Sequence, residues 1–154
     1  MVSVLFVCLG NICRSPMAES LFSYRVKEAG LSDKIFVSSA ATSTEELGNP
    51  PHRSTLTVLK KYGIPLVPHR ARQLTVRDGE RFDYLVGMDL QNVRGIRRIV
   101  GENHAEKARM LLDFTDSPRE IADPWYTGDF DAAYRDIAKG TQALLDEIRK
   151  KYGW

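Results

Sequence analysis

The chain has 154 residues and a net charge of +2, from 22 lysines and arginines against 20 aspartates and glutamates. Hydrophobic residues make up 43% and charged residues 27%, a balance that is typical of a globular protein and excludes a disordered or collagen-like chain. The longest apolar run, Val4–Leu9, is far shorter than the ~20 residues of a membrane-spanning helix. The small net charge predicts neither a nucleic-acid nor a membrane partner. We expect a single domain over residues 1–154.

The first elements along the chain are a strand and a helix. Val2–Val7 is apolar and β-branched, which predicts a strand buried on both faces. Ser15 and Pro16 predict the start of a helix, with the serine as N-cap and the proline at the first helical position. Apolar residues then recur at helical spacing until Gly30 ends the helix.

The later elements continue the alternation of strands and helices. A parallel sheet with helices on both faces is the expected result. Ligands of such sheets bind at the carboxyl ends of the strands, so the loop that follows the first strand is the expected site. The predicted strands are Lys34–Ser39, Asp83–Met88 and Arg109–Phe114, and the predicted helices are Ser54–Tyr62, Leu90–Val100 and about Asp131 to Lys151.

The chain contains only two cysteines, Cys8 and Cys13. Two cysteines are too few for a secreted disulfide framework in a chain of this length, so a reducing, cytoplasmic compartment is expected. A structural zinc site would need a second pair of ligands, and the three histidines are scattered, so no metal is expected. Cys13 is compatible with two interpretations, a small buried hydrophobic residue or a redox partner of Cys8.

The segment Cys8–Ser15 has the composition of an anion-binding loop that leads into a helix N-terminus. Gly10 and Asn11 tolerate the left-handed backbone that a tight cradle requires. Arg14 can bind two phosphate oxygens with its planar guanidinium. Cys8 begins the loop, where the same electrostatic field favours a thiolate, and Ser15 can donate a hydrogen bond to that thiolate. Together these residues indicate nucleophilic attack on phosphorus.

The pattern Cys8-x5-Arg14-Ser15 is the signature of cysteine-dependent phosphatases. Its position inside Val4–Glu19, near the N-terminus, resembles the low-molecular-weight protein tyrosine phosphatases. The resemblance covers essentially the whole chain in order. It continues through Ser38–Ser43, Gly48–Pro51, Gly63–Pro65, Ala71–Gln73, Phe82–Tyr84, Met88–Asp89 and Asp123–Pro124.

The resemblance implies an α/β fold, a four-stranded parallel sheet with helices on both faces (flavodoxin-like, the phosphotyrosine phosphatase I fold). It also implies hydrolysis of aryl phosphate monoesters, phosphotyrosine above all, through a phosphocysteine intermediate and without a cofactor. The expected partners are a phosphotyrosine-containing protein or a small aryl phosphate, with inorganic phosphate as product. The enzyme is expected to be a cytoplasmic monomer.

The resemblance also assigns roles to individual residues. Cys8 would be the nucleophile, Arg14 the phosphate clamp and Asp123 the general acid. Asn11 would hold the unusual backbone of the loop, supported by Ser39 and His69. Ser15 would stabilise the thiolate as a leaving group, and an aromatic slot would be lined by Leu9, Ile12, Trp125 and Tyr126. The expected substrate-binding residues are thus Leu9, Gly10, Asn11, Ile12, Cys13, Ser15, Trp125 and Tyr126.

Four positions depart from the family pattern. Trp125 stands where a tyrosine is common, His52 stands where an acidic residue is common, and Glu45 and Glu46 occupy a loop that often presents an aromatic residue to the substrate. These departures concern substrate preference rather than the chemistry.

Two other functions share parts of this sequence pattern. An arsenate reductase has a related fold and a similar anion loop, but its thioredoxin-coupled forms need more cysteines than Cys8 and Cys13. A non-catalytic phosphotyrosine-binding module would tolerate the loss of Cys8 or Asp123, and both are present. Hydrolysis of p-nitrophenyl phosphate, with and without vanadate, distinguishes the three.

Overall fold

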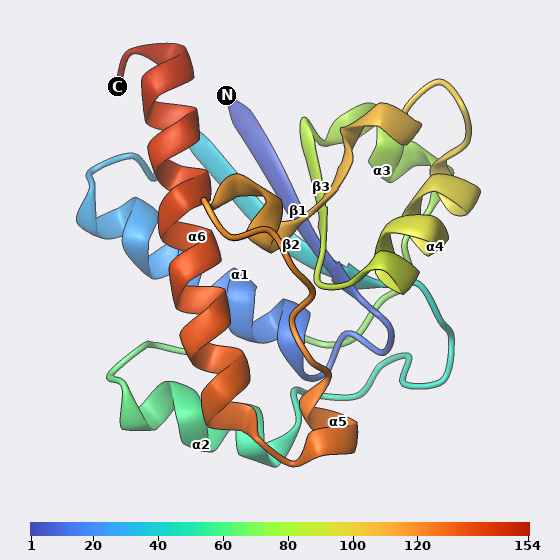
Figure 1. Cartoon of the computed structure of the whole chain (residues 1–154), viewed down its shortest axis with the longest axis vertical. Helices are drawn as coiled ribbons and strands as arrows, with labels where there is room; N and C mark the ends of the chain where they lie inside the picture. Colours follow the sequence, from blue (N-terminus) through green and yellow to red (C-terminus); the bar gives the residue numbers. More distant parts are fainter.

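The computed structural model describes all of residues 1–154 and has a parallel sheet at its centre (Figure 1). The four strands lie in the order β2-β1-β3-β4, and every neighbouring pair is parallel. The predicted fold class is therefore confirmed. The strands are β1 (Val2–Cys8), β2 (Ile35–Ala41), β3 (Tyr84–Gly87) and β4 (Ala108–Met110).

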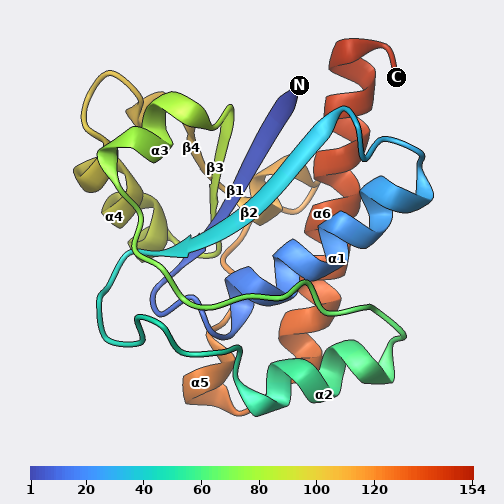
Figure 2. The same cartoon turned by 180° about the vertical axis from the view of Figure 1, so that it is seen from behind.

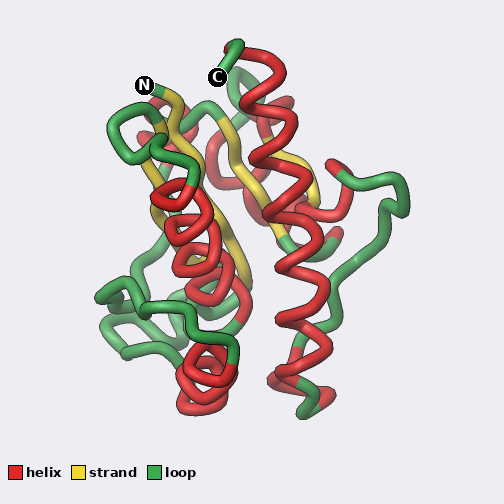
Figure 3. The backbone as a smooth tube through the Cα atoms, turned by 90° about the vertical axis from the view of Figure 1, so that its left-hand side faces the viewer, coloured by secondary structure: helices red, strands yellow, loops and turns green.

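Helices cover both faces of this sheet. Helices α1 and α6 pack together on one face, with α2 against them, while α3 and α4 cover the other face (Figures 1 and 2). Figure 3 shows α6 running along nearly the whole length of the molecule. The helices are α1 (Arg14–Glu28), α2 (Arg53–Lys61), α3 (Val76–Arg81), α4 (Leu90–Val100), α5 (Pro124–Thr127) and α6 (Phe130–Tyr152), with short 3-10 helices η1 (Ala105–Lys107) and η2 (Leu111–Phe114).

The central strand β1 divides the hydrophobic core into two parts. Val4 and Phe6 belong to the larger cluster beneath α1 and α6, while Leu5 and Val7 belong to the cluster beneath α3 and α4. All four side chains are fully buried. Alternate residues of a strand point to opposite faces, so an uninterrupted apolar run satisfies both clusters at once.

The last predicted strand, Arg109–Phe114, is wrong over its last four residues. Strand β4 ends at Met110, and the next four residues form the 3-10 helix η2. The Asp113 carboxylate accepts a hydrogen bond from the main-chain N–H of Met110 at 3.0 Å, which turns the chain. This turn buries the consecutive residues Leu111 and Leu112 together, whereas a strand would send them to opposite faces.

The predicted start of α1 is also corrected. The helix begins at Arg14 after Cys13 as N-cap, and no side chain caps it. Ser15 lies inside the first turn, where its hydroxyl contacts Cys8 and Asn11 instead of a helix N–H. The short helices α3 and α5 were not predicted, because helices of six and four residues are too short to show a hydrophobic period.

The loop between β1 and α1 lies at the carboxyl end of the sheet. The neighbours of β1 are β2 on one side and β3 on the other, so the strand order reverses at β1. Such a reversal opens a crevice outside the carboxyl ends of the strands. The topology thus places the loop Cys8–Ser15 where α/β proteins bind ligands. No helix in the chain is long and apolar enough to cross a membrane.

Candidate active site

The loop begins with Cys8, the last residue of β1, and curves so that the thiol meets the first turn of α1. The hydroxyl of Ser15 lies 3.0 Å from Cys8 Sγ, and the main-chain N–H of Ser15 donates to the same sulfur at 3.5 Å. Both contacts come from the positive end of the helix dipole. This environment stabilises a negative charge on the sulfur.

Asn11 holds the curvature of the loop. It is the only residue other than glycine with a positive φ, at 59°, and it is completely buried. Its side-chain amide donates to Ser15 Oγ at 2.7 Å and to Ser39 Oγ at 3.0 Å, while its Oδ1 accepts from the Arg72 main-chain N–H at 3.2 Å. His69 Nε2 lies 3.1 Å from the Asn11 carbonyl oxygen. Four contacts around one side chain and its carbonyl therefore hold a backbone conformation that asparagine rarely adopts.

Glu19 extends this network and was missed in the sequence. Ser39 Oγ donates to Glu19 Oε1 at 2.5 Å, and His69 Nδ1 lies 3.5 Å from the same oxygen. Burial raises the pKa of Glu19 above its ordinary value. A carbonyl oxygen only accepts hydrogen bonds, so His69 must donate its Nε2–H to Asn11. A single proton between His69 Nδ1 and the Glu19 carboxyl then serves both of these groups.

Arg14 is 99% buried and binds residues of two other segments, one after β3 and one before α5. Its Nη1 donates to Asp89 Oδ2 at 2.9 Å and to the Ile121 carbonyl at 2.7 Å, and its Nη2 lies 3.3 Å from Asp123 Oδ2. Its Nε is buried without a hydrogen-bond partner. An unpaired buried donor is costly, and a phosphate oxygen bound in the loop would satisfy it.

Asp123 approaches the loop from the N-terminus of α5. Its Oδ1 accepts from the Trp125 main-chain N–H at 3.0 Å, and Pro124 occupies the first position of the helix. The side chain is one-fifth exposed and lines the pocket. A carboxyl group 3.3 Å from the guanidinium of Arg14 is suitably placed for proton transfer to a leaving group.

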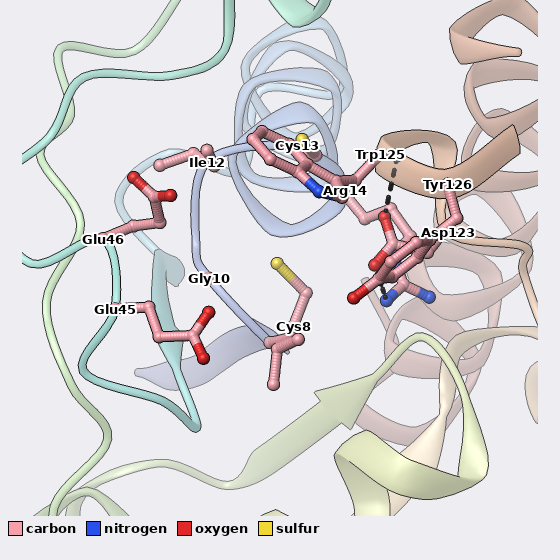
Figure 4. A pocket seen from close by; sticks show the side chains of 11 residues that line it. Cys8, Gly10, Ile12, Cys13, Arg14, Glu45, Glu46, Asp123, Trp125 and Tyr126 are labelled. Atoms are coloured by element: carbon pink, nitrogen blue, oxygen red, sulfur yellow. Dashed lines mark hydrogen bonds and ion pairs between the residues drawn. The ribbon is translucent and has the colours of Figure 1, made fainter. Parts of the chain in front are cut away.

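Figure 4 shows how these residues surround one pocket, with Cys8 at its floor. Trp125 and Tyr126, 54% and 76% exposed, form an aromatic wall. Asn11 and Ser15 have no exposed surface, so their side chains lie behind the loop and do not line the pocket. The lining residues are Cys8, Leu9, Gly10, Ile12, Cys13, Arg14, Glu45, Glu46, Asp123, Trp125 and Tyr126.

The structure thus brings nine sequence-predicted residues to the pocket and places Asn11, Ser15, Ser39 and His69 behind it. Asp89 was missed as a contact of Arg14. It directly follows the predicted strand Asp83–Met88, so its position at the carboxyl end of the sheet was available as a signal. Nothing in the sequence indicated the contact with the Ile121 carbonyl, because every residue has a main-chain carbonyl. No group of three or more His, Cys, Asp or Glu residues could hold a metal ion.

A cysteine beneath a helix N-terminus, a buried arginine with a free donor and an aspartate across the pocket define a cysteine-dependent phosphatase. Residues 3–153 match the family model "Low molecular weight phosphotyrosine protein phosphatase". The chain belongs to this family.

Curated relatives and solved structures agree with this assignment. The chain is 40% identical to the low molecular weight protein-tyrosine-phosphatase YfkJ of Bacillus subtilis, over 98% of both chains. It is 41% identical to the human low molecular weight phosphotyrosine protein phosphatase, over 94% of both. The crystal structure of YfkJ matches with a TM-score of 0.95, covering 98% of this chain and 96% of that one. A phosphatase from Streptococcus pyogenes matches with a TM-score of 0.87 at 38% identity, covering 96% and 93%.

Proposed function

We propose that this protein-tyrosine-phosphatase hydrolyses phosphotyrosine and related aryl phosphates through a phosphocysteine on Cys8, with Arg14 as phosphate clamp and Asp123 as general acid. The observation that carries the assignment is the buried Arg14 guanidinium, which has an unpaired Nε and belongs to a residue that lines the same pocket as Cys8. A cation with an unsatisfied donor beside a nucleophile is built for an anionic substrate.

In the first step, the Cys8 thiolate attacks phosphorus in line with the scissile bond. The P–S bond forms while the P–O bond to the phenol breaks, and Asp123 donates its proton to the departing oxygen. The aromatic ring leaves along the wall formed by Trp125 and Tyr126.

In the second step, a water molecule attacks the phosphocysteine. Asp123, now ionised, takes the proton of this water as the P–O bond forms. The P–S bond breaks and returns the thiolate, which Ser15 stabilises through its hydroxyl at 3.0 Å. Inorganic phosphate is released, and both Cys8 and Asp123 regain their starting states.

Arg14 and the loop amides stabilise charge on the equatorial oxygens in both steps. Asp89 and the Ile121 carbonyl hold the guanidinium before substrate arrives, so little reorganisation is needed in the transition state. Asn11, Ser39 and His69 hold the loop that presents its main-chain N–H groups. These residues are positioning residues, because their side chains do not reach the pocket.

The working form of the enzyme follows from the same features. Residues 1–154 act as one phosphatase domain, which the match over residues 3–153 supports. The pocket is complete within one chain, which supports a monomer. Two free thiols, one of them the nucleophile, suit a reducing compartment such as the cytoplasm. The substrates are phosphotyrosine-containing proteins or small aryl phosphates.

Rapid-quench kinetics with p-nitrophenyl phosphate test this assignment. A burst of p-nitrophenol equal to the enzyme concentration is expected, together with phosphate bound covalently to Cys8. Vanadate should abolish both signals. Turnover without a phosphoenzyme would overturn the covalent mechanism, and vanadate-resistant turnover would overturn the site. An absence of turnover with intact phosphotyrosine binding would favour the binding module, and arsenate reduction would favour the reductase.

A further inference from the structure

One wall of the pocket carries two carboxylates that the reaction does not use. Glu45 and Glu46 lie across the pocket from Asp123 and Tyr126 (Figure 4). They lie in the segment that connects β2 to α2, at one side of the pocket. A peptide that presents a phosphotyrosine to Cys8 therefore binds beside this acidic pair.

Glu46 is held against the phosphate loop. Asn49 Nδ2 donates to Glu46 Oε2 at 2.6 Å. Gly10 leaves room for the Glu46 side chain, because a Cβ at this position would lie 3.3 Å from Glu46 Cγ. The Glu46 charge reaches the loop, since it is one of the causes that raise the pKa of Cys13 to about 12, after burial and the charges of Cys8 and Asp123.

No cation neutralises the acidic pair. Neither Glu45 nor Glu46 takes part in an ion pair. Arg70 contacts the same loop, but it donates to the Gly48 carbonyl oxygen at 3.0 Å. Arg14 is paired with Asp89 and Asp123. The rim is thus negative above a floor that binds an anion.

We propose that Glu45 and Glu46 select phosphotyrosines that are flanked by lysine or arginine. This specificity rests on the proposed function, because it concerns substrates of the same pocket. The phosphate binds at the floor, while positive side chains beside the phosphotyrosine lie within reach of the acidic pair and offset its repulsion of the incoming phosphate. An acidic flank adds like charge at the same place, and such juxtaposition slows association and disfavours the complex.

The experiment compares two phosphotyrosine peptides of equal length, one with arginines on both sides of the phosphotyrosine and one with glutamates. Initial rates of phosphate release give kcat/KM at low and high salt for the wild-type enzyme and for Glu45→Gln/Glu46→Gln. The matched control is Glu102→Gln/Glu106→Gln, which removes two exposed charges before β4, at the amino-terminal end of the sheet.

At low salt, we expect the wild-type enzyme to favour the arginine peptide by about tenfold, and 0.5 M salt should reduce this ratio to about twofold. The ratio should fall toward one in Glu45→Gln/Glu46→Gln and stay at the wild-type value in the control. Glu45→Lys/Glu46→Lys should invert the preference. Circular dichroism confirms that each variant is folded.

Two results would overturn the proposal. Equal hydrolysis of both peptides by the wild-type enzyme would leave the proposed function intact and remove the specificity. A preference that persists unchanged in Glu45→Gln/Glu46→Gln would assign it to other residues. If the wild-type enzyme released no phosphate from either peptide or from p-nitrophenyl phosphate, the proposed function itself would fail.

Discussion

The floor and the rim of the pocket are built in opposite ways. At the floor and directly behind it, Arg14 and Asn11 are almost fully buried and are held by contacts from β2, the segment after β3 and the segment before α5. At the rim, Glu45, Trp125 and Tyr126 are exposed, and none of their side chains makes a hydrogen bond. A rigid floor places charges for the reaction, whereas a loosely held rim lets different substrates reach it. Substitutions at the floor should therefore cost far more activity than substitutions at the rim.

The largest effect is expected for Cys8→Ser. A serine hydroxyl is a far weaker nucleophile than a thiolate and has no base beside it, so kcat should fall about 10⁴-fold or more. The cradle remains, so calorimetry should still detect binding of inorganic phosphate. More than a trace of wild-type turnover would show that Cys8 is not the nucleophile.

Cys13 lies between the two regions, because it lines the pocket but is 95% buried. Burial is the main cause that raises its pKa from 9.0 to about 12. A raised pKa makes the thiolate scarce. Cys8→Ser loses the Cys8 charge but keeps burial, the main cause, so at pH 9 Cys13 in this folded variant should react with iodoacetamide at least about tenfold more slowly than in urea. The rate in the folded protein should rise with pH from 7 to 11 without a plateau. A plateau in the rate near pH 9 would show that the Cys13 thiol is exposed to solvent.

The raised pKa of Cys13 also affects its predicted redox role. A Cys8 sulfenic acid could be captured by Cys13 as a disulfide, and the attacking group must be the thiolate. After peroxide and then a thiol reductant, the wild-type enzyme should recover more activity than Cys13→Ser, and the difference should grow as the pH rises. Equal recovery without a Cys8–Cys13 disulfide in mass spectra would leave Cys13 as a packing residue.

Arg14→Lys tests whether the clamp needs the planar guanidinium. Lysine keeps the charge but cannot bind Asp89, the Ile121 carbonyl and two phosphate oxygens together, so kcat should fall about 10²–10³-fold. Arg25→Lys is a matched control, because Arg25 also has a buried, unpaired Nε but contacts Gln142 and Ala138. Near-normal kcat/KM in Arg14→Lys would show that Arg14 does not bind the phosphate.

Asp123→Asn should lower kcat about 10²-fold for phenyl phosphate and less for p-nitrophenyl phosphate. A poor leaving group needs the proton most, so the loss should increase with the basicity of the phenol. Asp129→Asn provides the control, since Asp129 is the N-cap of α6 and accepts from the Ala132 N–H. Equal losses for good and poor leaving groups would assign Asp123 a purely structural role.

The smallest effect is expected at the rim. Trp125→Ala removes one side of the aromatic wall and its edge contact with His52, whose ring centroid lies 5.7 Å away. Aromatic contacts are worth about 0.5–1.5 kcal/mol, which corresponds to a two- to tenfold loss in kcat/KM, mainly through KM. Tyr152→Ala, an exposed aromatic that stacks on Trp154, should leave both constants unchanged. A decrease in kcat that exceeds the increase in KM would show that Trp125 contacts the substrate in the transition state.

The sequence alone predicted the sheet and the loop, because both depend on local signals. An uninterrupted apolar run predicts a buried strand, and Cys8-x5-Arg14-Ser15 between this strand and a helix predicts a phosphate cradle. The exceptions were also local. Asp113 ends β4 early through a bond to its neighbour Met110, and Ser15 turns from the expected cap to Cys8.

Only the tertiary structure decided which distant residues complete the site. Asp89 lies in the segment that follows β3, and Ile121 lies shortly before α5, yet both contact the same nitrogen of Arg14. Glu19 lies in α1 and His69 lies in the segment before α3, yet their side chains meet behind Asn11. These contacts depend on the parallel order of the strands, which brings all their carboxyl ends to one edge. The sequence by itself determined the loop Cys8–Ser15 and its place between a strand and a helix. The fold determined which charged groups hold Arg14 and where the acidic pair lies above it, because those positions arise only when separate segments converge.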